Sequence, residues 1–191
     1  MKYDVIVIGG GHAGCEAAHA AAKLGSKVLM ITQNLETIAR MSCNPAMGGV
    51  AKGQILREID ALGGMSAVVT DESMIQFRML NRSKGPAMWS PRAQCDKKVF
   101  EKKWRYILEK NENIDFKQDT VESLIIKNNK VCGITTMLGN QIFSNTVILC
   151  SGTFMNGIIH LGLKNYKGGR SGEPSAKGIT RQLIDLGFEH G

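Results

Sequence analysis

The segment at residues 41–53, M-S-C-N-P-A-M-G-G-V-A-K-G, places a single cysteine in a loop-like stretch. Asn44 precedes a proline and is disfavoured in the helical region, so Cys43 is expected in extended or turn structure. The N-terminus of a helix expected over residues 54–62, together with Lys52, would favour a nearby thiolate. Reactive thiols occupy electropositive sites of this kind, which makes Cys43 the candidate catalytic residue. An inert cysteine in a turn is the alternative.

The segment at residues 9–14, G-G-G-H-A-G, follows a short apolar run and contains the spacing G-x-G-x-x-G. Glycines at these positions allow a tight turn, bring backbone N–H groups close to a pyrophosphate and let the next helix pack on the strand. The N-terminus of that helix then faces the phosphate charge. A glycine turn without a ligand is the alternative. The candidate cofactor-binding residues of this segment are Gly9, Gly10, Gly11, His12, Ala13 and Gly14.

The second strand of this pattern, expected over residues 27–32, lacks the acidic residue that commonly binds a ribose hydroxyl. Its end offers Thr32, Gln33 and Asn34 instead. Neutral side chains can still hydrogen-bond a ribose, but the departure favours a ligand held by more of the chain over NAD. FAD is such a ligand.

A third group of residues has the spacing of a metal site. His12, Cys15 and His19 fall at i, i+3 and i+7, on one stripe of a helix. However, His12 belongs to the phosphate loop, and no acidic or thiol fourth ligand is adjacent. A packed helix face is the favoured interpretation, and no metal site is predicted.

A polar and basic segment covers residues 80–96, L-N-R-S-K-G-P-A-M-W-S-P-R-A-Q-C-D. Its cations Arg82, Lys84 and Arg92 could hold an anionic ligand. A solvated surface loop is the alternative.

The composition is that of an ordinary globular protein, with 43% hydrophobic and 21% charged residues in a chain of 191 residues. No apolar run is long enough to span a membrane and no signal-peptide pattern opens the chain, so a soluble, cytoplasmic protein is expected. Five widely spaced cysteines without a C-x-x-C pair indicate reduced thiols rather than a disulfide framework. The formal net charge of +7 suits an anionic partner such as a nucleotide or RNA, although many enzymes are equally basic.

The elements that must position these residues begin with a β-α-β unit, which has the glycine turn at its first junction. An antiparallel meander and a returning apolar strand follow later in the chain. The expected elements are strands 4–8 and 27–32, helices 13–24, 54–62 and 96–110, meander strands 121–127, 131–137 and 141–144, a strand at 146–151, and a helix opened by Pro174 and stopped by Gly187, with Ile179, Leu183 and Leu186 inward.

This layout predicts an α/β fold of the Rossmann-like FAD/NAD(P)-binding class. The order of elements resembles the FAD-binding domain of glutathione-reductase-type flavoproteins, in which an antiparallel β-meander forms the crossover. The disulfide reductases of that group need a redox cysteine pair, which Cys43 lacks, so they are excluded. Residues 1–191 are expected to form one FAD-binding domain. Because no closing strand follows the last helix, the chain is expected to be the front part of a larger protein.

Six segments together resemble one family, the glucose-inhibited division protein A flavoproteins, which modify the wobble uridine of tRNA. They are G-G-G-H-A-G, S-C-N-P-A-M-G-G-V-A-K-G, E-I-D-A-L-G-G, S-K-G-P-A, R-A-Q-C-D and G-T-F-M-N-G. The resemblance covers essentially the whole chain, and the cysteine segment with S-K-G-P-A is far more specific than the glycine motif. The folate-dependent tRNA methyltransferase flavoproteins share mainly the fold and the N-terminal glycines.

The resemblance implies a homodimeric FAD enzyme that works with a GTPase partner on tRNA. It implies that NADH reduces the flavin, that methylenetetrahydrofolate donates the methylene carbon, and that an aminomethyl or carboxymethylaminomethyl group is formed at C5 of the uridine. The glycine segment matches the pyrophosphate loop, and Val121 matches a position next to the adenine. Ala176 falls opposite a cofactor-contacting position that is usually serine. Thr32 is shared with the family.

Cys43 matches one of the two functionally important cysteines of the family. A thiolate can add to C6 of uracil and so activate C5, but assistance to the flavin step is an open alternative. The family's second cysteine, later glycine motif and helical C-terminal region have no counterpart up to Gly191. Two other interpretations are an FAD-dependent oxidoreductase with a substrate unrelated to RNA, and a nucleotide-binding module without catalysis.

Overall fold

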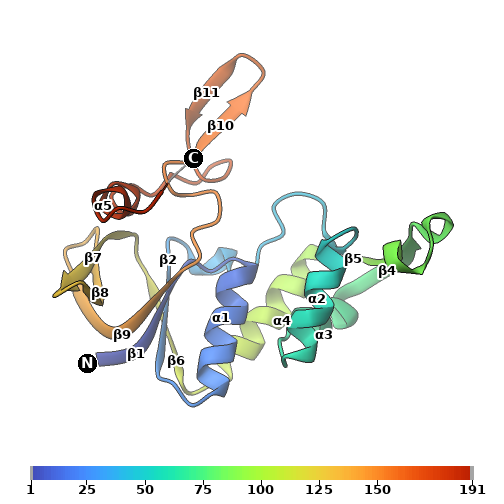
Figure 1. Ribbon diagram of the computed structural model, residues 1–191, viewed down its shortest axis with the longest axis horizontal. Coiled ribbons are helices and arrows are strands. Elements are labelled where there is room, and N and C mark those ends of the chain that lie inside the picture. Colours follow the sequence, from blue (N-terminus) through green and yellow to red (C-terminus); the bar gives the residue numbers. More distant parts are fainter. Residues whose placement is uncertain (1, 190–191) are drawn as a thin grey trace.

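The computed structural model describes residues 2–189, so Met1, His190 and Gly191 of the predicted domain lie outside the described part. Its centre is a six-stranded sheet with the order β6-β2-β1-β9-β8-β7 (Figure 1). The first four strands in this order are mutually parallel, and β7, β8 and β9 form an antiparallel meander. The strands are β1 (Lys2–Ile8), β2 (Val28–Thr32), β6 (Ile114–Gln118), β7 (Val121–Lys127), β8 (Lys130–Thr136) and β9 (Gln141–Leu149).

The β1 and β2 strands form because each is a short apolar run ended by small or polar residues. Buried residues alternate between the two faces of the sheet, as the two-residue period of a strand requires. Val7 and Met30 contribute to the core on one face, whereas Ile6 and Leu29 contribute to the core on the other. The parallel part of the sheet is therefore covered on both sides, as is usual for parallel sheets.

Helices α1 (His12–Lys23) and α4 (Lys97–Glu109) cover one face of the sheet (Figure 1). Phe100, Trp104 and Leu108 lie on one side of α4 and are fully buried, because their spacing of four residues keeps them on one face of the helix. Asp96 caps α4, since its Oδ1 accepts hydrogen bonds from the backbone N–H groups of the first turn.

The other face of the parallel strands is covered by the meander of the same sheet, which curls over it, and by a short helix, α5 (Ile179–Asp185). Val121, Ile134 and Ile179 are buried there together with apolar residues of β1 and β2. The segment from β9 to α5 also contains a projecting two-stranded hairpin, β10 (Ile158–Leu161) and β11 (Lys164–Lys167) (Figure 1).

A second, three-stranded sheet lies beyond α1 and carries the loop that contains Cys43. Its order is β3-β5-β4, and both pairings are antiparallel. Figure 1 shows β4 and β5 projecting beyond the adjacent helices as a hairpin with a folded tip. The elements of this region are β3 (Ala46–Gly48), α2 (Lys52–Ala61), α3 (Ser66–Ser73), β4 (Met74–Leu80) and β5 (Ser90–Cys95), with short 3-10 turns at η1 (Leu35–Thr37), η2 (Arg82–Lys84) and η3 (Pro86–Met88).

The predicted α/β class with a parallel sheet is confirmed, and the predicted β-α-β opening is present. Two predictions near the end of the meander were wrong in detail. The strands expected at 141–144 and 146–151 are one continuous strand, β9, whose first three residues pair with β8 and whose residues 143–149 pair with β1. Thr146 does not interrupt it because its hydroxyl donates a hydrogen bond to the backbone oxygen of Asp4 on the neighbouring strand.

The last helix was also predicted too long. It begins at Ile179, directly after Gly178, whose φ is 101°. The helix does not start earlier because Ala176 is extended and pairs with Met155 in an isolated β-bridge. Leu186, expected to face inward, is 45% exposed. Six strands were not predicted from the sequence: β3, β4, β5, β6, β10 and β11.

Within residues 2–189, none of the helices has the length and apolar character that crossing a bilayer requires.

Candidate functional site

A cavity of about 440 Å³ opens at the C-terminal ends of β1, β2, β6 and β9. This is the edge at which parallel α/β sheets bind their ligands. Seven of the nine candidate site residues line this cavity, whereas Ala13 and Gly14 do not. The predicted residues in its wall are Gly9, Gly10, Gly11, His12, Cys43, Val121 and Ala176.

The glycine turn between β1 and α1 shapes one wall of the cavity. Gly9 has a φ of 108°, and a Cβ there would lie 2.3 Å from the Cys150 backbone oxygen. A Cβ on Gly14 would lie 1.9 Å from the Gly9 backbone oxygen, so Gly14 acts by letting α1 approach the turn rather than by touching a ligand. A Cβ on Gly11 would meet no atom within 4 Å, because Gly11 borders the cavity. No side chain of residues 2–189 caps the N-terminus of α1, so its first N–H groups suit an anion.

The His12 side chain links this turn to the loop that carries Cys43. Its Nε2 lies 3.2 Å from the Ala39 backbone oxygen, and the Ala39 N–H donates a hydrogen bond to the Gly10 backbone oxygen. Burial lowers the pKa of His12, and the nearby positive charges of Lys52 and Arg170 lower it further. His12 is therefore neutral near pH 7, and it fixes the position of the loop.

Cys43 itself lies in a bend between η1 and β3, as predicted, and is exposed. The Lys52 Nζ donates a hydrogen bond to the Ala46 backbone oxygen across the same loop, at the start of α2. Cys150 is the other thiol in the cavity wall, and desolvation raises its pKa. Cys43 is thus the thiol of this cavity that solvent and a large substrate can reach.

The end of β2 lacks the acidic residue that commonly binds a ribose hydroxyl, but an aspartate follows the neighbouring strand β6. Thr32, Gln33 and Asn34 line the cavity, and so does Asp119, which directly follows β6. The Asp119 N–H donates to the Thr32 backbone oxygen at 3.0 Å, and the Asp119 Oδ1 accepts from the Thr120 N–H at 2.8 Å. Among the described residues, nothing donates to the buried Asp119 Oδ2 or Gln33 Oε1. Sequence reasoning missed Asp119 because β6 was not predicted; the alternating run I-D-F-K-Q before it was the available signal.

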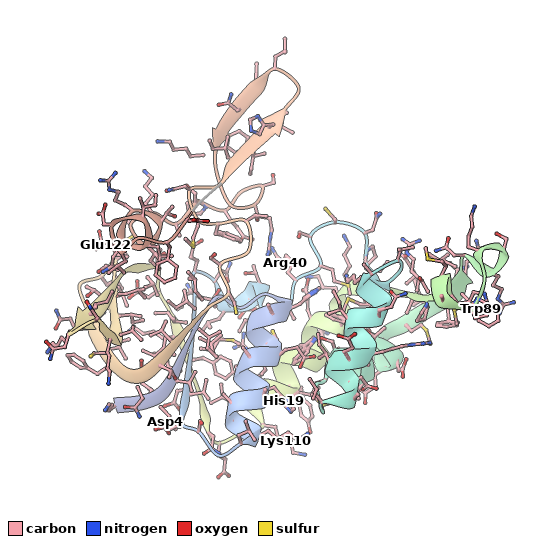
Figure 2. All side chains as sticks on the ribbon, in the orientation of Figure 1. Asp4, His19, Arg40, Trp89, Lys110 and Glu122 are labelled. Atoms are coloured by element: carbon pink, nitrogen blue, oxygen red, sulfur yellow. The ribbon has the colours of Figure 1, made fainter. Side chains whose placement is uncertain are left out.

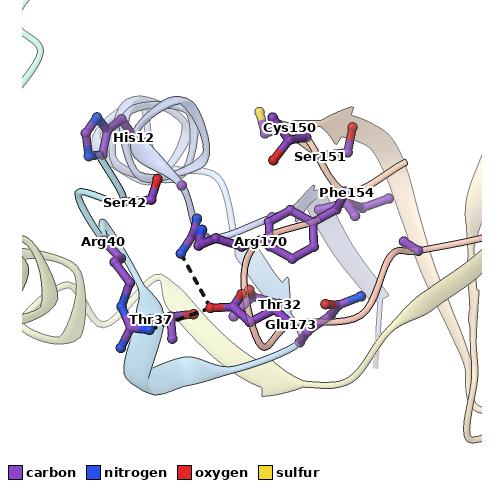
Figure 3. Close-up of a pocket in the computed structure, with 18 of the residues that line it drawn as sticks. His12, Thr32, Thr37, Arg40, Ser42, Cys150, Ser151, Phe154, Arg170 and Glu173 are labelled. Carbon is purple, nitrogen blue, oxygen red and sulfur yellow. Dashed lines mark ion pairs between the residues drawn. The ribbon is translucent and has the colours of Figure 1, made fainter. Parts of the chain in front are cut away.

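A small ion-pair network closes the cavity on the opposite side (Figure 3). The Glu173 Oε1 lies 3.6 Å from Arg170 Nη1 and also 3.6 Å from Arg40 Nη1. The Arg170 guanidinium also lies over the Phe154 ring, 5.4 Å from its centroid. All four side chains line the cavity, and none was singled out from the sequence. They place two positive charges beside the space that an anionic ligand would occupy.

Other residues considered in the sequence analysis lie elsewhere. Arg82, Lys84 and Arg92 belong to the β4–β5 hairpin and do not line the cavity. No group of three or more potential metal ligands is present within residues 2–189, and His12 of the proposed stripe is engaged with Ala39. Together, the wall residues can hold a phosphate-containing ligand and present one accessible thiol beside it.

A known protein family and solved structures resemble this chain over nearly its whole length. The family model described as "Glucose inhibited division protein A" matches residues 4–191. This chain is 65% identical to the tRNA uridine 5-carboxymethylaminomethyl modification enzyme MnmG of Cytophaga hutchinsonii and 63% identical to that of Karelsulcia muelleri, over 190 residues in each case. Each alignment covers 100% of this chain and 31% of the relative. The solved structure of Aquifex aeolicus GidA superposes with a TM-score of 0.93 at 48% identity, over 98% of this chain and 31% of that one.

The chain therefore spans about 31% of the length of the curated relatives that it matches. The family model covers all but the first three residues, and the identity to these relatives extends along the whole chain. On this basis the chain belongs to the glucose inhibited division protein A family.

Proposed function

We propose that this chain is the FAD-binding part of an enzyme that modifies C5 of the wobble uridine in tRNA. One observation carries the proposal: the glycine turn, Val121, Ala176 and Cys43 come from four separate parts of the chain and line one cavity. A nucleotide-binding turn and an accessible thiol in the same wall suit an enzyme better than a nucleotide-binding module alone. The relatives named as tRNA uridine modification enzymes support the choice of substrate.

The cavity wall fits the adenosine diphosphate part of FAD. The uncapped N-terminus of α1 offers N–H groups to a pyrophosphate, and the open side of Gly11 leaves room for it. Within the described residues, the buried Asp119 Oδ2 and Gln33 Oε1 accept no hydrogen bond, and ribose hydroxyls would supply the donors. Val121 and Ala176 would lie beside the adenosine, in the glutathione-reductase-type arrangement proposed for this fold. Bound FAD would supply oxidation–reduction chemistry.

In this proposal Cys43 acts on the target base. Its thiolate adds to C6 of the uracil ring and forms a C–S bond, which makes C5 a nucleophile towards a one-carbon electrophile. Loss of the C5 proton then breaks the C–S bond and releases the modified base together with the thiolate. The exposed position of Cys43 supports this role over a purely flavin-directed one, because a base flipped out of RNA can reach it.

The remaining components of the proposal are those that the sequence resemblance implies. They are methylenetetrahydrofolate as the one-carbon donor, NADH as the reductant, a GTPase partner, a homodimeric assembly and a cytoplasmic location with the tRNA pool.

The test replaces Cys43 by serine in the intact protein. Cys43→Ser should abolish the wobble modification, measured as the nucleoside composition of cellular tRNA, and should leave flavin absorbance unchanged. Cys132→Ser is the matched control, since Cys132 lies on β8 outside the cavity wall. Normal modification in Cys43→Ser would refute the catalytic role. Unaltered tRNA after deletion of the whole gene would refute the tRNA function.

A further inference from the structure

We infer that the outward face of the β3-β5-β4 sheet and its hairpin tip form a docking surface for single-stranded RNA next to the target base. We call this surface the hairpin face and define it by Arg78, Arg82, Lys84, Trp89 and Arg92. The inference rests on the proposed function and adds the place where the RNA substrate is held. None of these residues lines the cavity described above.

The first argument is charge. Residues 74–95 include four cations, Arg78, Arg82, Lys84 and Arg92, and no aspartate or glutamate. None of the four takes part in an ion pair among residues 2–189. The cations of the hairpin are thus available to phosphates, which supply most of the affinity in RNA recognition.

The second argument is the register of the strands. Arg78 of β4 is directly opposite Arg92 of β5, and residues opposite each other across an antiparallel pair share a face. Two like charges in this position destabilise the sheet unless an anion lies between them. The neighbouring pair, Phe77 and Ala93, points to the other face, where Ala93 is buried in the core. The arginine pair therefore lies on the face opposite Ala93, where Arg78 is exposed and Arg92 is half-buried.

The third argument is the position of the face relative to Cys43. Arg92 also pairs with Gly48 of β3, and Gln94 pairs with Ala46. Ala46 shares this face and lines the cavity, three residues after Cys43. The hairpin face therefore continues directly into the cavity wall, so that an RNA strand lying on it can deliver a base to the thiol.

The fourth argument is the aromatic residue at the tip. Trp89 lies at the far end of the hairpin and is 44% exposed (Figure 2). Its Nε1 donates a hydrogen bond to the Arg82 backbone oxygen at 3.2 Å, which fixes the orientation of the ring. A fixed, exposed aromatic ring between cations is the arrangement on which unpaired bases stack. This favours a single-stranded loop of RNA over an acidic protein as the occupant.

The experiment measures binding of a fluorescent anticodon stem-loop RNA to the intact, flavin-loaded protein over a range of salt concentrations. The test variant is Arg78→Gln/Arg82→Gln/Lys84→Gln. The charge-matched control is Lys97→Gln/Lys130→Gln/Lys164→Gln, three exposed cations that form no ion pair in the described chain and lie outside the hairpin. The hairpin variant should lose about 2 units of the salt-dependence slope, at about 0.7 per phosphate contact on a single strand. The control variant should keep most of the salt-dependence slope of the unaltered protein.

Two single variants test the stacking role. Trp89→Ala should weaken RNA binding about tenfold, whereas Trp89→Phe should retain most of the affinity because it keeps an aromatic face. Equal loss in both variants would mean that the indole hydrogen bond matters and stacking does not.

The outcomes separate the inference from the proposed function. Equal RNA affinity and salt slope in the hairpin variant and its control would overturn the hairpin face and would leave tRNA modification standing. No RNA binding by the unaltered protein, together with normal tRNA nucleosides after gene deletion, would overturn both.

Discussion

Arg40 Nη1 lies 3.6 Å from the Glu173 carboxylate, so the loop that carries Cys43 is joined across the cavity to the segment that follows β9 (Figure 3). Glu173 also faces Arg170, and the same carboxylate therefore orients two guanidinium groups. Neither pair is fully buried, so their contribution to global stability is small. The Arg40–Glu173 pair joins the two segments, whereas the Arg170–Glu173 pair lies within one of them.

Glu173→Gln removes the charge that Arg40 and Arg170 share, while Arg40 keeps its pair with Glu101. We expect the free energy of unfolding to fall by only about 1 kcal/mol or less, because the paired side chains are partly exposed. Amide hydrogen exchange in the loop from Arg40 to Ala46 should accelerate severalfold, because the loop loses its tie to the opposite wall. Asp185→Asn breaks the exposed pair with Arg181 and serves as the control. Unchanged exchange in the loop would contradict the prediction.

Alanine at two glycines of the turn between β1 and α1 should change stability by different amounts. Gly14→Ala should lower the free energy of unfolding by about 1–3 kcal/mol, because the added Cβ meets the Gly9 backbone oxygen at 1.9 Å. Gly11→Ala should change stability by about 0.5 kcal/mol or less, since its Cβ meets nothing within 4 Å.

Flavin binding should separate the same two variants. Gly11→Ala should keep its fold and yet bind flavin about tenfold more weakly or worse, because the methyl group occupies space beside the helix N-terminus. Urea denaturation and flavin titration of both variants check this pair of predictions. Wild-type flavin affinity in Gly11→Ala would mean that no ligand approaches this turn.

Asp119→Asn tests the proposed replacement for the missing acid of β2. The asparagine oxygen can still accept the Thr120 N–H, so stability should change little. Loss of a buried anionic acceptor should weaken flavin binding by about tenfold, roughly the contribution of one hydrogen bond to a charged group. Flavin titration measures this effect, with the exposed Asp185→Asn as control. Equal flavin affinity in the two variants would remove Asp119 from the ribose site.

The depressed pKa of His12 predicts a pH dependence of the cofactor-free protein. Because the native state holds His12 neutral, the unfolded chain binds the proton first as the pH falls below about 6.5. The contribution of neutral His12 to the free energy of unfolding is present above that pH. It is lost as the pH falls through the lower pKa that His12 has in the native state. His12→Asn should therefore flatten the decline in stability between about pH 7 and pH 5.

Thermal unfolding across this range measures that slope. His160→Asn, at an exposed position on β10, is the control and should leave the slope unchanged. A slope that is identical in the wild type and His12→Asn would show that another group causes the decline.

Local patterns in the sequence were enough for the nucleotide-binding half of the fold. The apolar runs of β1 and β2, the glycine turn and the apolar stripe of α4 each depend on residues that are neighbours in the chain. Their predictions were accordingly correct to within one or two residues. The interpretation of residues 121–144 as an antiparallel meander was also correct, because its turns at Asn128 and Gly139 are local signals.

Predictions failed where pairing partners are distant. Whether residues 141–149 form one strand or two is decided by β1 and β8 together, and the start of α5 is decided by the bridge between Ala176 and Met155. The β5 strand was interpreted as part of a polar loop over residues 80–96, because polar side chains such as Arg92 and Gln94 alternate there with the buried Ala93 and Cys95.

For the candidate site, the sequence by itself determined the glycine turn and the loop position of Cys43, since both follow from backbone preferences of glycine and proline. Only the tertiary structure decided that the two line one cavity, with Asp119 hydrogen-bonded to the Thr32 backbone and Arg40 facing Glu173. The reason is physical: parallel strand pairing brings the ends of β1, β2, β6 and β9 to one edge, and this proximity depends on contacts between residues that are far apart in the chain.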